Sequence, residues 1–155
     1  MRVIIIDDHA LFRDGLKGLL ELRSIDVAGV AADGKEGIEL AKKIVADGEG
    51  ATKFIEITVQ SAKNENQAKK AAFAIANSNL VKTAAFGCNP NWGRVAAAVG
   101  SLGLKIDEKH LKIKFSSFDK KNIRICVDLS LGSAKATVYT SDLSQGYVYI
   151  NAKYN

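Results

Sequence analysis

The sequence is poor in the residues that build disulfide, metal or rigid-turn frameworks: its 155 residues include one proline, two cysteines and two histidines. Cys88 and Cys126 lie far apart, which predicts two buried thiols of a cytosolic protein rather than a disulfide or a metal site. His9 and His110 are also isolated, so the ligand spacing of a zinc site is missing. These scarcities exclude a disulfide-rich secreted scaffold, and we expect a cytoplasmic protein.

Long apolar runs and dense clusters of one charge are missing too. No apolar run approaches the roughly 20 residues that a membrane helix needs. The opening MRVIIID has one Arg and leads into two Asp residues, which indicates a buried strand rather than a signal peptide. The net charge is +5, but the lysines are spread along the chain, and pairs such as Lys69 and Lys70 lack interleaved aromatic residues. We therefore expect a solvated basic face, and neither a nucleic acid nor a membrane as a partner.

The chain opens with alternating strand and helix patterns. Residues 3–6 are a continuous β-branched run, typical of a strand buried on both faces. Residues 10–23 carry a helical apolar stripe, and residues 26–32 predict a second strand. Asp33 and Glu36 predict a capping box for the next helix. This β-α-β-α order predicts parallel strands joined by right-handed crossovers.

The opening text, VIIIDDHALFRDGLKGLLE and then DVAGVAADGKEGIELA, resembles the receiver domain of response regulators over about residues 1–42. The resemblance implies that Asp7 and Asp8, at the end of the first strand, hold Mg²⁺ weakly, because this ion prefers oxygen ligands. The alternative is a residual acidic strand end, with Asp8 capping the helix. The receiver family also needs a phosphoacceptor Asp after its third strand, and the matching segment FIEITVQSA ends without one.

The next part of the chain mixes strand and helix signals. Residues 53–59 alternate apolar and polar side chains, which predicts a strand. Asn64 and Gln67 predict the cap of a helix with a regular apolar stripe. Residues 80–86 are predicted to form a strand. In the following GCNPNWGRVAAAVG text, a helix is expected with Asn89 as its cap, Pro90 in its first position and Trp92, Val95, Ala96 and Val99 on its inward face.

The last part is predicted to be rich in β-structure. Residues 111–115 and 123–129 alternate apolar with polar side chains. Residues 131–133 are typical of a hairpin turn. Residues 134–139 and 147–150 complete a run of strands that we expect to be antiparallel.

Four motifs in this second part carry another resemblance: IVADGEGATKFIEITV, FGCNPNWGRVAAAVG, ICVDLSLGSAKATVYTSDL and YVYINAKY. In this order they resemble the C-terminal part of ornithine acetyltransferase, the bifunctional glutamate N-acetyltransferase of arginine biosynthesis, over about residues 42–155. The resemblance implies acetyl transfer from N-acetylornithine to glutamate through an N-terminal Thr exposed by self-cleavage. That Thr and the oxyanion-hole residues would lie upstream of this text, so we expect no catalysis by the chain alone.

The same resemblance transfers two substrate contacts and no catalytic residue. They are Glu49 in DGEGATK and Asn151 in YVYINAKY, since a carboxylate suits the ornithine ammonium and an amide suits an α-carboxylate. In the alternatives, Glu49 only complements the following turn, Asn151 is a hydrogen-bonding residue at a sheet end, and residues 91–94 serve packing and helix initiation. The family has a longer segment between the strands that here end at Phe115 and begin at Asn122, which suggests a deletion.

Together these patterns predict an α/β chain with an α+β tail. A receiver-like βαβα fragment, residues 1–46, would continue into a second βαβα run and an antiparallel β-rich end, in an ornithine-acetyltransferase-like domain of residues 47–155. We expect a catalytically inactive chimeric or recombined protein, spliced in the helix around residues 40–45. One alternative is an ornithine acetyltransferase fragment that keeps substrate binding and needs an N-terminal partner chain. The second alternative is a degenerate phosphorelay receiver.

Partners follow from the same interpretation. Half of a receiver leaves strand edges unpaired, and a part separated from the domain that it packs against leaves apolar surface exposed. Two-fold dimers are the commonest way to cover such surfaces. We therefore expect a homodimer that binds ornithine or glutamate, with no cofactor apart from weak Mg²⁺ at Asp7 and Asp8.

Overall fold

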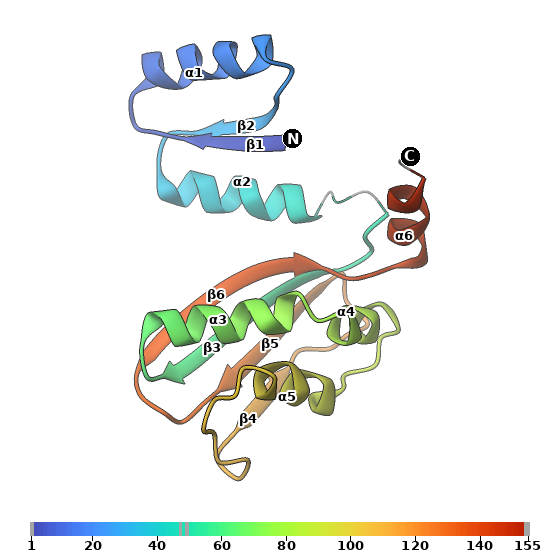
Figure 1. Ribbon diagram of the computed structural model, residues 1–155. Coiled ribbons are helices and arrows are strands. Elements are labelled where there is room, and N and C mark those ends of the chain that lie inside the picture. Colours follow the sequence, from blue (N-terminus) through green and yellow to red (C-terminus); the bar gives the residue numbers. More distant parts are fainter. Residues whose placement is uncertain (1, 47, 49, 154–155) are drawn as a thin grey trace. The chain divides into compact units, whose positions relative to one another are not determined.

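The computed structural model describes residues 2–46, 48 and 50–153 of the chain. They fall into two compact units, residues 1–47 (unit 1) and residues 48–155 (unit 2). Within the described residues, six helices and two sheets form a mixed α/β fold (Figure 1). None of these helices is long and apolar enough to cross a membrane. The domain boundary expected between residues 46 and 47 stays a prediction.

Unit 1 is a two-stranded sheet with two helices. Its elements are β1 (Arg2–Ile6), α1 (Ala10–Leu22), β2 (Asp26–Ala31) and α2 (Gly34–Ala46). The strands pair in parallel, as expected, and α1 and α2 lie on opposite faces of the sheet (Figure 1). The β-α-β-α pattern in the sequence is therefore confirmed.

Two helix caps were considered for unit 1, and the structure confirms the cap of α2 but not that of α1. Asp33 Oδ1 accepts the N–H of Glu36 at 2.8 Å. Glu36 Oε2 accepts the N–H of Ala32 at 2.8 Å, so the predicted reciprocal cap of α2 is confirmed. The N-cap of α1 is His9, whose side chain makes no capping bond. The alternative in which Asp8 caps this helix is therefore wrong.

Unit 2 is built on a four-stranded mixed sheet in the order β4-β5-β3-β6. Its strands are β3 (Phe54–Ala62), β4 (Lys112–Phe115), β5 (Asn122–Asp128) and β6 (Ala134–Ser141). β3 is parallel to β5 and antiparallel to β6, and β4 is antiparallel to β5. β1 and β3 belong to different sheets, so the chain does not form one continuous parallel sheet.

The predicted hairpin between β5 and β6 is wrong because β3 lies between these two strands. The N–H groups of Leu131 and Gly132 instead donate to Ser61 O of β3, at 2.7 and 2.9 Å. Ser61 has a φ of +55°, and the pairing of β3 with β6 shifts register around it. Alternation along a strand tells which side chains point inward, but it does not tell which strands are neighbours.

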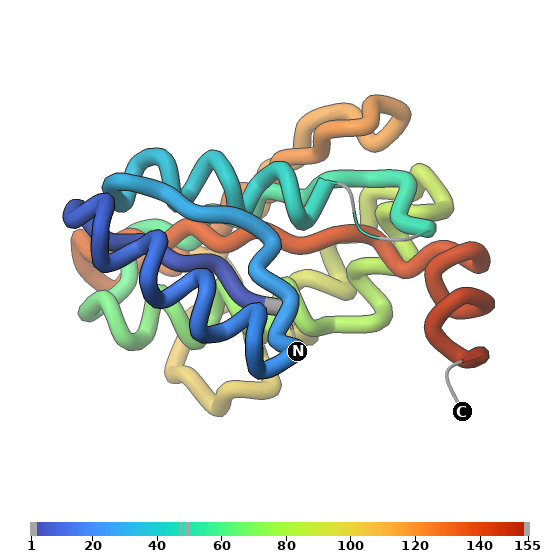
Figure 2. The backbone as a smooth tube through the Cα atoms, turned by 90° about the horizontal axis from the view of Figure 1, so that it is seen from above, coloured from blue at the N-terminus to red at the C-terminus, as the bar shows by residue number. Residues whose placement is uncertain are grey.

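The helices of unit 2 are α3 (Glu65–Ala76), α4 (Asn79–Phe86), α5 (Trp92–Gly100) and α6 (Gln145–Ala152). α3 packs on β3 and β6, and α5 packs on α3 (Figure 1). The chain leaves β6 and turns directly into α6 (Figure 2). The expected cap of α3 is confirmed, since Asn64 Oδ1 accepts the N–H of Gln67 at 2.8 Å.

Two segments expected to be strands are helices. Residues 80–86 belong to α4, and residues 147–150 belong to α6. Each helix has a serine N-cap: Ser78 accepts from Val81 N at 3.4 Å, and Ser144 accepts from Tyr147 N at 2.9 Å. A short apolar run does not distinguish a strand from a packed helix, and the serine that begins the helix is the better signal.

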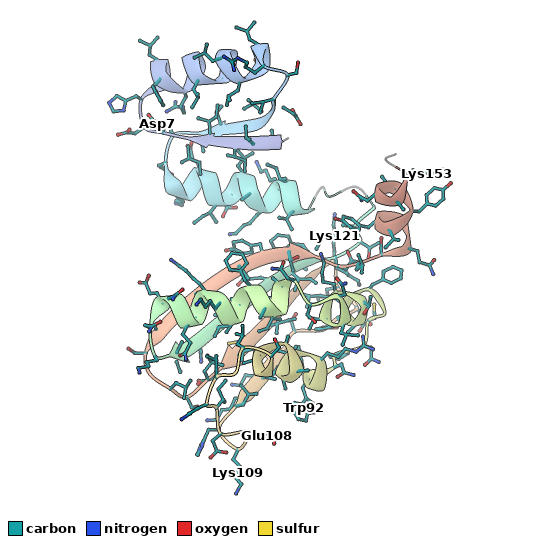
Figure 3. All side chains as sticks on the ribbon, in the orientation of Figure 1. Asp7, Trp92, Glu108, Lys109, Lys121 and Lys153 are labelled. Carbon is teal, nitrogen blue, oxygen red and sulfur yellow. The ribbon has the colours of Figure 1, made fainter. Side chains whose placement is uncertain are left out.

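The helix after α4 begins two residues later than expected. The side chain of Asn91, not Asn89, accepts the N–H of Arg94 and forms the N-cap of α5. Val95 and Val99 are buried as predicted, whereas Trp92 is 57% exposed. Trp92 sits in the first position of the helix and points away from the unit (Figure 3).

The core of unit 2 lies between the sheet and α3, α4 and α5. Alternate side chains of β3 and β5 point into it, and small alanines of α3 let that helix approach the sheet closely. The largest apolar side chains that are fully buried in this core are Ile55, Ile57, Val59, Ile75, Val95, Val99, Ile123, Ile125, Val127 and Leu129.

Candidate functional site

A buried carboxylate fixes the chain just after the DGEG motif. Asp142, at the end of β6, is fully buried. Its Oδ1 accepts the N–H groups of Thr52 and Lys53 at 2.8 and 2.9 Å, and its Oδ2 accepts the Thr52 hydroxyl at 2.5 Å. The Asp142 N–H donates in turn to Lys53 O at 3.2 Å. Three donors satisfy the buried carboxylate, so residues 50–53 are held firmly against the end of β6.

A second clamp joins the same segment to the start of α6. The Ser144 hydroxyl donates to Gly50 O and also accepts the N–H of Tyr147. Gly50 has a φ of +76°, and a Cβ at this position would overlap the backbone of Gly146 and Tyr147. Only glycine fits here, because it tolerates both the left-handed backbone and the close approach.

The structure places one of the two predicted substrate contacts. Glu49 lies outside the described residues. Asn151 is exposed on α6, and its Nδ2 donates to Tyr147 O at 2.8 Å. Asn151 is therefore helical, and the alternative that it ends a strand is wrong. It lies one helical turn after Tyr147, whose backbone faces Gly50, so the residue that follows Glu49 contacts the helix that carries Asn151. Substrate binding by Glu49 and Asn151 stays a prediction.

Lys53 connects this segment to a third part of unit 2. Its Nζ donates to the carbonyl oxygens of Phe118, Asp119 and Lys120 at 2.9, 3.4 and 3.3 Å. Phe118 is buried in the core. Three carbonyl oxygens of the connection between β4 and β5 thus accept from the single ammonium group of Lys53. No local pattern in the sequence indicates the roles of Lys53, Asp142 or Ser144, because each acts on a residue far away along the chain.

The NPNWGR motif has a structural role, in agreement with the packing alternative. Arg94 Nη1 donates to Leu80 O at 2.8 Å and to Thr83 Oγ1 at 3.3 Å, which ties α5 to α4. The thiol prediction is wrong in part, since Cys88 is exposed and Cys126 is half-buried. Cys88 has a φ of +52° and ends α4 in the left-handed conformation.

In the structure, His9 lies beside the acidic pair Asp7 and Asp8 of unit 1. One ligand atom each of Asp7, Asp8 and His9 lie within 4.8 Å of one another, at the end of β1 where Figure 3 marks Asp7. The His9 N–H donates to Asp7 Oδ1 at 2.8 Å, and His9 Nδ1 lies 2.8 Å from Asp8 Oδ1. These local bonds explain the cluster without an ion. Mg²⁺ binding at Asp7 and Asp8 stays a prediction.

Two carboxyl groups away from the clamped segment have lowered pKa values. Gln60 Nε2 donates to Asp128 Oδ2 at 3.0 Å, and this hydrogen bond is the main cause of the lowered pKa of Asp128. The hydrogen bond from Lys42 is the main cause that lowers the pKa of Glu39. Both pairs stabilise the charged form of the carboxyl group and belong to the framework rather than to the site.

Comparison with known proteins places most of the chain in one family. The ArgJ family matches residues 35–155. The arginine biosynthesis bifunctional protein ArgJ of Geobacter sulfurreducens is 46% identical over 138 residues, which cover 76% of this chain and 35% of that protein. The glutamate N-acetyltransferase of Methanopyrus kandleri is 45% identical over 139 residues, which cover 75% and 36%. The ArgJ protein of Chlorobaculum tepidum is 36% identical over 170 residues, which cover 96% and 42%. The chain thus spans about a third of the length of the first two relatives.

A solved structure extends the similarity over nearly the whole chain. The crystal structure of the arginine biosynthesis bifunctional protein argJ from Bacillus halodurans has a TM-score of 0.72 and 25% identity. The match covers 99% of this chain and 100% of that one.

These matches contradict the prediction of a chimera with a receiver domain at residues 1–42. One ArgJ structure accounts for 99% of the chain and one ArgJ relative aligns with 96% of it, so no separate receiver-derived part remains. The degenerate-receiver alternative is dropped with it. The error has a physical reason: a β-α-β-α opening with acidic residues at a strand end recurs in many α/β folds, and about forty residues do not specify a function.

Proposed function

The chain belongs to the ArgJ family, and from this premise we propose that it is the C-terminal, substrate-binding part of a glutamate N-acetyltransferase that works with an N-terminal partner chain. The relatives named above are described as glutamate N-acetyltransferases or bifunctional proteins of arginine biosynthesis. The proposed substrates are therefore ornithine, glutamate and their N-acetyl forms.

The observation that supports this proposal is the double clamp on residues 50–53. Asp142 and Ser144 hold this segment against the end of β6 and the start of α6. The clamp fixes the residue next to Glu49 against the helix that carries Asn151. A carboxylate for the ornithine ammonium and an amide for the α-carboxylate would then come from neighbouring elements, and fixed contacts of this kind orient a substrate for reaction.

The partner chain follows from the chemistry of acyl transfer. The reaction needs an activated nucleophile and donors for the oxyanion. In the family that the sequence resembles, the nucleophile is an N-terminal Thr upstream of the part matched here. Since the chain covers only 35% of the Geobacter relative, the remaining sequence of such proteins is the natural source of both groups.

The test is to measure ornithine binding by titration calorimetry and acetyl transfer from N-acetylornithine to glutamate. Asn151→Ala should weaken ornithine binding about tenfold or more, because a hydrogen bond to a charged group contributes about 1.5–3 kcal/mol. The control is Asn66→Ala, which removes an exposed asparagine from α3. Transfer should require the part of the Geobacter protein that precedes the matched region, supplied as a second chain. Absence of ornithine binding, or equal binding by both variants, contradicts the proposed site; turnover by the chain alone contradicts the need for a partner.

A further inference from the structure

The outer side of helix α1 in unit 1 is an uncovered apolar surface. The helix packs on β1 and β2 through its inner side (Figure 1), and none of its residues is buried. Its outer side carries large apolar residues at helical spacing. They are Leu11, Phe12, Leu19 and Leu22, which are 88, 58, 63 and 84% exposed. Contiguous apolar patches of this kind usually mark a binding surface.

This surface of α1 has a notch at Gly15. A hollow of about 400 Å³ lies there, lined by residues of α1 alone: Leu11, Phe12, Gly15, Leu16 and Leu19. A Cβ added at Gly15 would meet nothing within 4 Å, so another helix can approach closely at this point. Phe12 and Leu19 stand one turn before and one turn after the notch. The surface therefore fits a second helix that inserts an apolar side chain between them, and α1 of another copy is such a helix.

The charges beside the notch favour one direction for that second helix. Asp14 and Lys17 are both exposed, on either side of Gly15 and Leu16 in the sequence. In an antiparallel pair with its two-fold axis between Gly15 and Leu16, Asp14 lies opposite Lys17 of the partner subunit. Lys17 Nζ is 3.9 Å from Glu21 Oε1 in its own helix, a long separation that leaves the ammonium able to bind a second carboxylate. Opposite charges across the contact favour this arrangement, whereas a parallel pair would place like charges side by side.

We propose that two copies of this chain form a dimer by antiparallel packing of α1, with Leu16 of each copy in the notch at Gly15 of the partner subunit. The same surface then serves both copies, as two-fold symmetry requires. The inference does not depend on the proposed function, because α1 precedes residues 35–155, which the ArgJ family matches. A contact between two 13-residue helices is smaller than the roughly 800 Å² per partner of a standard interface, so we expect a weak dimer.

Sedimentation velocity over a dilution series of the whole chain measures the Kd of the dimer. Leu19→Glu should raise Kd at least about tenfold, because the two-fold axis buries the new charge twice in the contact. Leu19 is 63% exposed, so the variant should fold, which circular dichroism verifies; Leu11→Glu, at an 88% exposed position of the same hollow, is the second variant. The matched control is Phe73→Glu on α3, where the side chain is 54% exposed. It should change Kd less than about twofold, as expected for a residue outside the contact.

An exchange of charges tests the antiparallel direction. Asp14→Lys places two like charges opposite each other and should raise Kd about fivefold, since an exposed ion pair contributes up to about 1 kcal/mol. Adding Lys17→Asp brings opposite charges together again, so the double variant should return to within about twofold of the wild-type Kd.

The outcomes decide the inference and keep it apart from the proposed function. A wild type that stays at 16.6 kDa across the series overturns the dimer. A dimer that Leu19→Glu and Leu11→Glu leave intact uses another surface, and a double variant as weak as Asp14→Lys contradicts the antiparallel pairing; either result overturns the inference. Ornithine binding by the same samples tests the proposed function separately, since its absence in a dimeric wild type contradicts that function and leaves the α1 contact standing.

Discussion

Unit 2 has a contiguous hydrophobic core, whereas unit 1 buries only Ile5 and Ala31 among its described apolar residues. In unit 2 the alternate residues of β3 and β5 are fully covered by α3, α4 and α5. In unit 1 many large apolar side chains stay exposed. They are Ile6, Leu11, Phe12, Leu19, Leu22, Val30 and Ile38.

The difference shows how strand number limits burial. A four-stranded sheet offers two central strands whose inner faces are covered, whereas the two strands of unit 1 pair only with each other within the described residues. A unit of fewer than 50 residues buries a small share of its surface and is at best marginally stable by itself. Unit 1 therefore needs another surface to cover its apolar side chains. The homodimer expected from the sequence would supply one, and it stays a prediction.

Removing one isoleucine from each unit tests this difference in burial most directly. Ile57→Ala should destabilise unit 2 by about 2–5 kcal/mol, because it leaves a cavity in a closed core. Ile6→Ala removes a side chain that is 51% exposed and should cost about 1 kcal/mol. Amide hydrogen exchange of the buried residues of β3, followed in urea, reports the unfolding of unit 2. A shift of this transition by Ile6→Ala as large as that by Ile57→Ala would show that the stability of unit 2 depends on unit 1.

A second test concerns the clamp formed by Asp142 and Ser144, which holds residues 50–53 in the candidate site of unit 2. Gly50→Ala should destabilise the chain by about 1–3 kcal/mol more than Gly103→Ala. Both glycines have positive φ, but only at Gly50 would an added Cβ overlap the backbone of another segment. Ornithine binding should be lost in Gly50→Ala and unchanged in Gly103→Ala. Chemical denaturation and titration calorimetry measure the two effects. Equal destabilisation by both variants would indicate backbone strain alone and no close contact with α6.

Local features of the fold could be predicted from the sequence. The caps formed by Asn64 with Gln67 and by Asp33 with Glu36 depend on residues three positions apart, and the structure confirms both. The alternation in β3 and β5 correctly gave the buried faces of these strands. Such patterns are reliable because neighbouring residues alone determine them.

Features that depend on distant residues could not be predicted. Nothing within residues 122–141 shows that β3 inserts between β5 and β6. The bond between Thr52 and Asp142 joins residues 90 positions apart. The apolar runs of α4 and α6 suit a strand as well as a helix until the serine caps are considered. Of the candidate site, the DGEGATK motif and Asn151 came from the family resemblance, and the residues that position them came only from the structure.

The smallest expected effect concerns pH and the hydrogen bond between Gln60 and Asp128 on adjacent strands of unit 2. Because the pKa of Asp128 is lowered in the folded state from an ordinary value of 3.8, its charged form adds stability above about pH 4, and that stability is lost as pH falls through the lowered pKa. Gln60→Ala should therefore destabilise the chain more at pH 7 than at pH 2.5, by no more than about 1 kcal/mol for a partly exposed pair.

Urea unfolding at the two pH values measures this difference. In an Asp128→Asn background the effect of Gln60→Ala should no longer depend on pH, because the titrating group is gone. The same comparison made with Glu39 and Lys42 in unit 1 should give a smaller pH effect of the same sign, since solvent screens that pair on an exposed helix surface. A pH dependence that survives in the Asp128→Asn background would mean that Gln60 stabilises the sheet through another ionisable group, and that the lowered pKa of Asp128 has a different cause.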